Sequence, residues 1–133
     1  MRGLLVSGAV IVLGILPTAA FAAPMDGSAP LLCAATTVIE CSRKGDCQRS
    51  SPEDAQVPGF VKVDFPKSVL SSIDGSRTSA ITANQRNNGK LMIQGMQNER
   101  VWGAVIDEQT GMMTATIGED DGAIVIVGTC IAP

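Results

Sequence analysis

The chain has 133 residues and a formal net charge of −3, with four cysteines, no histidine and no tyrosine. The absence of histidine excludes nucleophile–histidine catalysis and histidine-ligated metal sites. The negative charge and the few aromatic side chains argue against nucleic-acid binding, which needs concentrated positive charge or aromatic stacking platforms.

The first 22 residues have the pattern of a secretory signal peptide. Arg2 precedes an apolar stretch at residues 4–16, and Ala20-Phe21-Ala22 fits a cleavage site. The apolar stretch is shorter than the roughly 20 residues that a membrane-spanning helix needs. We therefore expect cleavage after Ala22, a periplasmic or secreted location, and no stable membrane insertion after cleavage.

Residues 23–133 are expected to form one β domain, with residues 23–31 as a flexible lead-in. Residues 31–40 are rich in β-branched side chains and predict a strand, while residues 42–56 are polar and predict a loop. Residues 69–73 fit either a short strand or a helical turn. Further strands are predicted at 60–65, 77–84, 90–97, 101–107, 112–117 and 123–130.

Turn signals recur about every 8–12 residues, and Asn88-Gly89 is a strong hairpin signal. This spacing predicts an all-β fold: a small antiparallel meander of seven or eight strands that forms a barrel or a sandwich. The central strands carry apolar residues on both faces, with Trp102 and Ala104 on one and Val101 and Val105 on the other. Either the outer face is covered, by the N-terminal segment or a second subunit, or the sheet curls.

The four cysteines predict two disulfides, because paired cysteines are typical of exported proteins. Cys33 and Cys41 are too far apart to pair within one extended strand. We favour Cys41–Cys47, which closes a small loop, with Cys33–Cys130, which ties the first strand to the last. Cys33–Cys47 with Cys41–Cys130 is the second choice. The sequence contains no Cys-x-x-Cys motif of the kind that thioredoxin-like redox chemistry uses. The spacing of the four cysteines also lacks the two close pairs that are usual in a zinc site.

Candidate catalytic groups are restricted to carboxylates, namely Asp64, Asp74, Asp107 and Glu108. Solvated turn carboxylates are the commoner interpretation of such residues. The acidic turn at residues 119–122 lacks the ligand spacing of a calcium loop, and the methionines are better explained as core residues than as a copper site. We therefore expect a protein that is not an enzyme and has no cofactor or metal.

Two features suggest contacts with a ligand or partner. Trp102 could floor an apolar pocket, although a single tryptophan in a strand is more often a core anchor. Arg43, Lys44 and Arg49 surround the Cys41–Cys47 loop and could meet an anionic partner, although three cations make a weak patch.

The order of the segments ECSRKGDC, PGFVKVDFPK, RTSAI, GKLMIQGMQNERVWGAVIDEQTGMMTATI and AIVIVGTC resembles a group of small exported bacterial (proteobacterial-type) proteins without assigned function. The resemblance covers nearly the whole chain after the leader and implies localisation rather than activity. The chain is also loosely similar to periplasmic lysozyme inhibitors with a lipocalin-like barrel, which link an early cysteine to a late one. Their Ser-Gly…Tyr inhibitory loop has no counterpart here.

Together these observations predict a non-catalytic periplasmic β-domain that binds a protein or a small apolar ligand. The alternative is an inhibitor of an exported hydrolase, either a lysozyme or a protease. A homo-oligomer is compatible with the apolar outer face of the central strands.

Overall fold

The computed structural model describes residue 14 and residues 23–133, so the predicted signal peptide and its cleavage site lie outside the described residues, Gly14 apart. The regular structure of the described part consists of β-strands alone. They are β1 (Leu31–Ser42), β2 (Cys47–Ser50), β3 (Phe60–Asp64), β4 (Val69–Ser72), β5 (Thr78–Asn87), β6 (Lys90–Gln97), β7 (Arg100–Asp107), β8 (Met112–Gly118) and β9 (Gly122–Ile131).

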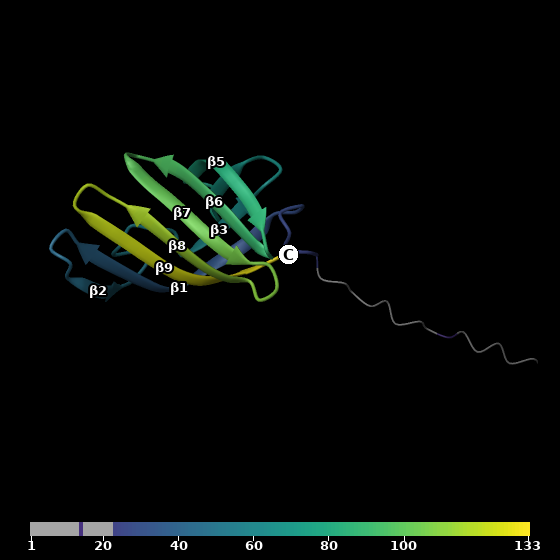
Figure 1. Ribbon diagram of the computed structural model, residues 1–133, viewed down its shortest axis with the longest axis horizontal. Coiled ribbons are helices and arrows are strands. Elements are labelled where there is room, and N and C mark those ends of the chain that lie inside the picture. The colour runs from purple at the N-terminus through teal and green to yellow at the C-terminus, as the bar shows by residue number, and fades with distance from the viewer. Residues whose placement is uncertain (1–13, 15–22) are drawn as a thin grey trace, which may run out of the picture.

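The strands form a closed antiparallel barrel (Figure 1). Strands β3 to β9 follow one another as a meander, and β9 returns to pair along the whole length of β1, from Leu32 opposite Ile131 to Ser42 opposite Gly122. The other edge of β1 is shared, because its first half pairs with β3 and its second half with β2. The predicted all-β meander is therefore confirmed as an eight-stranded barrel of β1 and β3–β9, with β2 as an additional strand.

Two local predictions change. Residues 47–50 were expected to belong to a polar loop, but they form β2, because the Cys41–Cys47 bridge holds them beside the long β1 strand. The undecided segment at residues 69–73 forms strand β4, since it completes the sheet between β3 and β5. The Asn88-Gly89 hairpin is confirmed, and both residues have positive φ, 48° and 71°.

Curling of the sheet into a barrel buries one apolar face of the central strands and leaves the other exposed. On β7, Ala104 and Ile106 are buried, whereas Val101 and Val105 remain 59% and 45% exposed on the outer wall. The barrel interior holds the five most completely buried side chains of the described part, which are Leu31, Cys33, Val63, Ile106 and Cys130. Alternation along each strand thus places one row in the core and one row outside.

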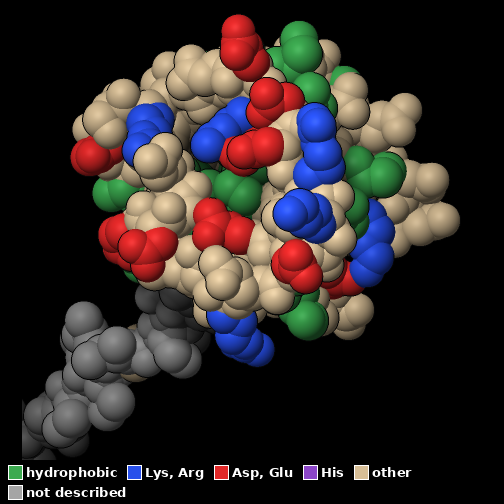
Figure 2. Space-filling view, turned by 90° about the vertical axis from the view of Figure 1, so that its left-hand side faces the viewer, with side chains coloured by type: hydrophobic (Ala, Val, Ile, Leu, Met, Phe, Trp, Pro, Cys, Tyr) green, Lys and Arg blue, Asp and Glu red, His purple; other side chains and the backbone are tan. Residues whose placement is uncertain are grey.

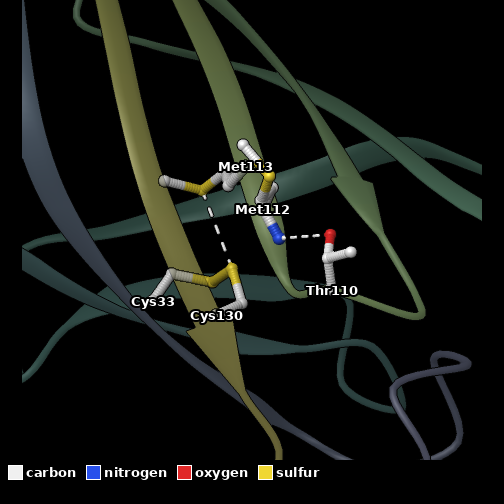
Figure 3. Close-up of a disulfide and its surroundings, with 5 residues drawn as sticks. All are labelled: Cys33, Thr110, Met112, Met113 and Cys130. Atoms are coloured by element: carbon white, nitrogen blue, oxygen red, sulfur yellow. Dashed lines mark hydrogen bonds between the residues drawn. A yellow bond between two sulfur atoms is a disulfide. The ribbon is translucent and has the colours of Figure 1, made fainter.

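Both favoured disulfides are present in the structure. Each joins residues that lie directly opposite one another on paired strands, Cys33 and Cys130 across β1–β9 and Cys41 and Cys47 across β1–β2. The sulfur of Met113 lies 3.8 Å from Sγ of Cys130 inside the barrel (Figure 3). The first bridge is therefore part of the core, while Cys47 of the second is exposed.

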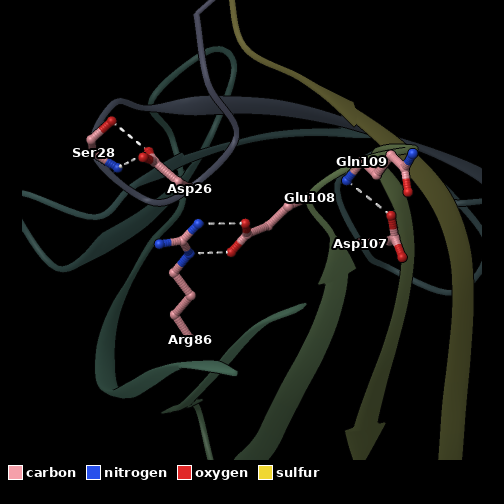
Figure 4. Close-up of polar contacts among 6 residues, drawn as sticks. All are labelled: Asp26, Ser28, Arg86, Asp107, Glu108 and Gln109. Atoms are coloured by element: carbon pink, nitrogen blue, oxygen red, sulfur yellow. Dashed lines mark hydrogen bonds and ion pairs between the residues drawn. The ribbon is translucent and has the colours of Figure 1, made fainter. Parts of the chain in front are cut away.

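The two ends of the barrel differ. We call the end where β1 begins the base end; it carries the β5–β6 and β7–β8 turns and both Leu31 and Ile131. There Arg86 makes two hydrogen bonds to Glu108, of 2.5 and 2.8 Å (Figure 4). Residues 23–31 were predicted to be a flexible lead-in, but Met25 within them packs against the hydrophobic core. The base end is therefore covered by the chain itself.

The opposite end, which we call the mouth end, carries the β2–β3 loop and the β4–β5, β6–β7 and β8–β9 turns. Figure 2 views the molecule from this side, which lies at the left in Figure 1, and shows Lys and Arg side chains interspersed with Asp and Glu around it. Within the described residues, the structure has no helix of the length and apolarity needed to cross a membrane.

The two disulfides should differ in their effect on stability. Cys33–Cys130 spans 97 residues and Cys41–Cys47 spans 6, so the chain-entropy model gives about 4–5 kcal/mol for the first and about 2 kcal/mol for the second. In urea unfolding, Cys33→Ala/Cys130→Ala should therefore lose clearly more free energy of unfolding than Cys41→Ala/Cys47→Ala. Equal losses would show that loop closure is not the stabilising contribution.

Candidate ligand-binding site at the barrel mouth

The barrel contains an apolar inner cavity of about 90 Å³. Its walls come from β1, β3, β4, β6, β7, β8 and β9 and from the β2–β3 loop, and every lining residue is apolar, a glycine or a half-cystine. The lining residues are Cys33, Ala35, Val57, Pro58, Gly59, Val61, Val63, Leu70, Ile93, Trp102, Ala104, Met113, Ala115, Ile117 and Ile126. Small inward side chains such as Ala35, Ala104 and Ala115 leave this space unfilled, because an eight-stranded barrel is just wide enough for larger side chains to fill.

The inner cavity adjoins a wider hollow of about 680 Å³ at the mouth end, which we call the mouth. Five residues line both spaces: Val57, Pro58, Leu70, Trp102 and Ile117. The mouth adds polar residues from the β4–β5 and β6–β7 turns to this apolar floor. The site therefore changes from apolar inside to polar outside along the barrel axis.

Trp102 lies at the junction of the two spaces. Its Nε1 donates a 2.8 Å hydrogen bond to Oγ of Ser79, and that hydroxyl donates to the backbone oxygen of Met96 at 3.3 Å. The polar atom of the indole is thus satisfied within the wall, and the apolar ring is left to line the cavity. Gly95 lies directly opposite on β6 and provides the room that the ring occupies.

The β2–β3 loop contributes the roof of the site. Its residues Ala55 and Val57 are buried in the core, at 3% and 6% exposure, although the surrounding sequence is polar. Turn hydrogen bonds from the N–H groups of Ala55 and Val57 to the carbonyls of Ser51 and Pro52 hold the loop in shape. Sequence reasoning missed this element, and the available signal was the apolar pair Ala55-x-Val57 within a polar segment.

The β4–β5 turn forms a hydrogen-bonded part of the rim. Oδ1 of Asp74 accepts from the hydroxyl of Ser72 at 2.5 Å and from the backbone N–H of Ser76 at 3.0 Å. The Ser72 hydroxyl, and after it the N–H and hydroxyl of Ser76, lower the pKa of Asp74 to about 2. The carboxylate is therefore ionised and committed to its own turn.

The predicted contact residues are not all brought together. Trp102 lines the site, whereas Arg43, Lys44 and Arg49 lie on the β1–β2 hairpin and line neither the mouth nor the inner cavity. Nη2 of Arg43 donates to the backbone oxygen of Asp120 at 2.6 Å. The hollow beside this hairpin is lined by Glu40, Asp46, Glu119 and Asp121 together with Cys41 and Cys47. The loop cations thus belong to a separate, acidic region.

The other candidate carboxylates lie at the base end, away from the mouth. Asp64 is buried and accepts from the N–H of Lys67, and Glu108 pairs with Arg86. Asp107 pairs with Lys90. The hydrogen bond from Lys90 is the largest cause, and those from Thr110 the next, that hold the pKa of the Asp107 carboxyl well below its usual range. In the part of the chain that the structure describes, no three His, Cys, Asp or Glu residues are grouped so that they could hold a metal ion.

Comparison with protein-family models, with curated proteins and with solved structures finds no match to this chain. The resemblance to small exported bacterial proteins and the similarity to lysozyme inhibitors therefore stay predictions, as does the absence of catalysis.

The packing of Trp102 against Gly95 can be tested directly. A methyl group at Gly95 would lie 2.5 Å from Cζ2 of Trp102 and closer still to the carbonyl oxygen of Ala80. Gly95→Ala should therefore lower the free energy of unfolding by about 1–3 kcal/mol, as overpacking does, and shift the Trp102 emission. Gly103→Ala is the control, since its nearest neighbour would be an ordinary contact at 3.6 Å. Similar behaviour of the two variants would contradict the close approach.

The Asp74 turn predicts a pH dependence of stability. The folded pKa of about 2 lies below the ordinary 3.8, so ionised Asp74 stabilises the fold above that value and loses this effect as the pH falls through 2. Asp74→Ala should be less stable than the wild type at pH 7, and the difference should narrow between about pH 4 and pH 2. Asp46→Ala, at an exposed turn residue, is the control in the same urea titrations. A difference that does not vary with pH would refute this role of the carboxylate.

Proposed function

We propose that the protein is a non-catalytic binding protein that takes a small apolar ligand end-on through the mouth of the barrel. The observation that carries the proposal is the apolar wall shared by the mouth and the inner cavity. Ligand sites are commonly concave and largely apolar, with a few polar groups and volumes of roughly 300–1,000 Å³, and the mouth falls in this range.

The physical chemistry of the interior supports this use. Protein cores are normally close-packed, so an unfilled apolar cavity loses dispersion contacts that a ligand would restore. An apolar cavity of this kind is not stabilised by water, because its walls offer no hydrogen-bond partners. A ligand with an apolar group that enters past Trp102 would therefore displace little ordered water and gain contacts on all sides.

The proposed setting is extracytoplasmic. Two disulfides, one in the core and one at the mouth end, fit an oxidising environment. Periplasmic or secreted location and removal of residues 1–22 are part of this proposal and rest on the signal-peptide pattern.

Binding can be followed through the protein's own fluorescence, because Trp102 is its single tryptophan and tyrosine is absent. Addition of 1-octanol should change the Trp102 emission saturably. In a second assay, 1-octanol should displace bound N-phenyl-1-naphthylamine and so abolish the energy transfer from Trp102 to that probe. Ala115→Leu would fill much of the inner cavity and should weaken binding at least about tenfold, since the ligand competes for the same space.

Thr116→Leu is the matched control, because Thr116 neighbours Ala115 on β8 but lies on the exposed face of the strand. It should bind like the wild type, and circular dichroism should show that both variants are folded. Absence of a saturable change in Trp102 emission, or wild-type binding by folded Ala115→Leu, would disprove the proposed function.

A further inference from the structure

The residues that line the mouth are more basic than the chain as a whole. Its lining includes Arg77 and Arg100 and contains no Asp or Glu, although the chain has 13 acidic and 10 basic residues. The remaining polar lining residues are Ser, Thr, Asn and Gln, which are Gln56, Ser72, Ser76, Thr78, Ser79, Gln97 and Asn98. The lining itself therefore presents guanidinium groups and neutral hydrogen-bonding groups, and the ionised Asp74 carboxylate lies in the adjoining β4–β5 turn.

Arg77 is held in place by its backbone. Its N–H donates to Oγ of Ser72 at 3.0 Å, and its carbonyl accepts from the N–H of Ser72 at 2.9 Å. Its Nη1 donates to the backbone oxygen of Gln56 at 2.7 Å, which joins the β4–β5 turn to the β2–β3 loop. Within the described residues, Arg77 forms no ion pair. Arginine has five N–H donors, so most of this guanidinium remains for a ligand.

Two carboxylates lie beside the mouth, and both already have partners. Glu119 lies 2.6 Å from Nη2 of Arg100 and belongs to the neighbouring acidic hollow rather than to the mouth. Asp74 is committed to Ser72 and Ser76 within its turn. Arg100 is thus partly neutralised, and Arg77 is the principal cation of the mouth.

From this arrangement we infer that the ligand is an amphiphile with a single carboxylate headgroup, which Arg77 binds at the rim while the apolar chain passes Trp102 into the inner cavity. This inference rests on the proposed function and adds the chemical class of the ligand. Guanidinium and carboxylate groups match as bidentate partners, and a hydrogen bond between charged groups is about twice as strong as a neutral one. The small inner cavity restricts the buried part to a short chain.

The test compares three probes that share an eight-carbon chain: octanoate, 1-octanol and octylammonium. Their affinities are measured at pH 7.5 by the emission of Trp102. Octanoate should bind about tenfold or more tightly than 1-octanol, and octylammonium should bind weakest. The preference for octanoate should shrink as the salt concentration rises, because ions screen a charge pair at the rim.

Arg77→Gln should reduce the affinity for octanoate about tenfold and leave that for 1-octanol unchanged. Arg77→Lys should recover part of the loss, since it restores the charge without the planar geometry. Arg49→Gln is the matched control, because it removes an exposed arginine of β2 that does not line the mouth. Urea unfolding of each variant shows whether the β2–β3 loop has been disturbed.

The outcomes separate the two proposals. If 1-octanol binds as tightly as octanoate, or if Arg77→Gln and Arg49→Gln behave alike, the carboxylate headgroup is refuted and the apolar site stands. If neither octanoate nor 1-octanol binds, the proposed function fails as well.

Discussion

The pairing of β1 with β9 is the constraint on which the rest of the structure depends. It closes the meander into a barrel, and the Cys33–Cys130 bridge joins the same two strands within the core. Without this closure, the row of Leu31, Val63 and Ile106 would line an open sheet exposed to water. Because Cys33 and Cys130 are 97 residues apart in the sequence, the contact between β1 and β9 is entropically costly to form, and a covalent link between them reduces the entropy of the unfolded chain.

Closure also determines what the interior can do. Eight strands leave a lumen that side chains can fill, and at the base end Leu31, Ile106 and the Cys33–Cys130 bridge are almost completely buried in it. Towards the mouth, the inward side chains at positions 35, 104 and 115 are alanines, which are too small to fill the lumen and leave the cavity. One end of the barrel is therefore closely packed, while the other keeps an apolar cavity at some loss of packing.

Much of the fold could be predicted from the sequence, because strand alternation, turn residues such as Asn88-Gly89 and cysteine spacing are local signals. The choice between barrel and sandwich could not, since it depends on whether β9 meets β1. β2 has only four residues within a polar segment, so its own sequence is a weak strand signal, and it pairs with β1 beside the Cys41–Cys47 bridge. Trp102 was singled out from its residue type, but Arg77 was not, because its position beside the mouth follows from three-dimensional closure.

The Cys41–Cys47 bridge links the local strand pairing of β2 to the loop that covers the mouth. It aligns β2 with the second half of β1, and β2 leads directly into the loop whose Ala55 and Val57 reach the core. The far side of the same loop is held by the hydrogen bond from Arg77 to Gln56. The loop over the mouth is therefore fixed at its start by a disulfide and near its end by Arg77, which lines the mouth. The two disulfides thus support opposite ends: one joins the strands that close the barrel wall, and the other aligns the strand that leads into the loop over the mouth.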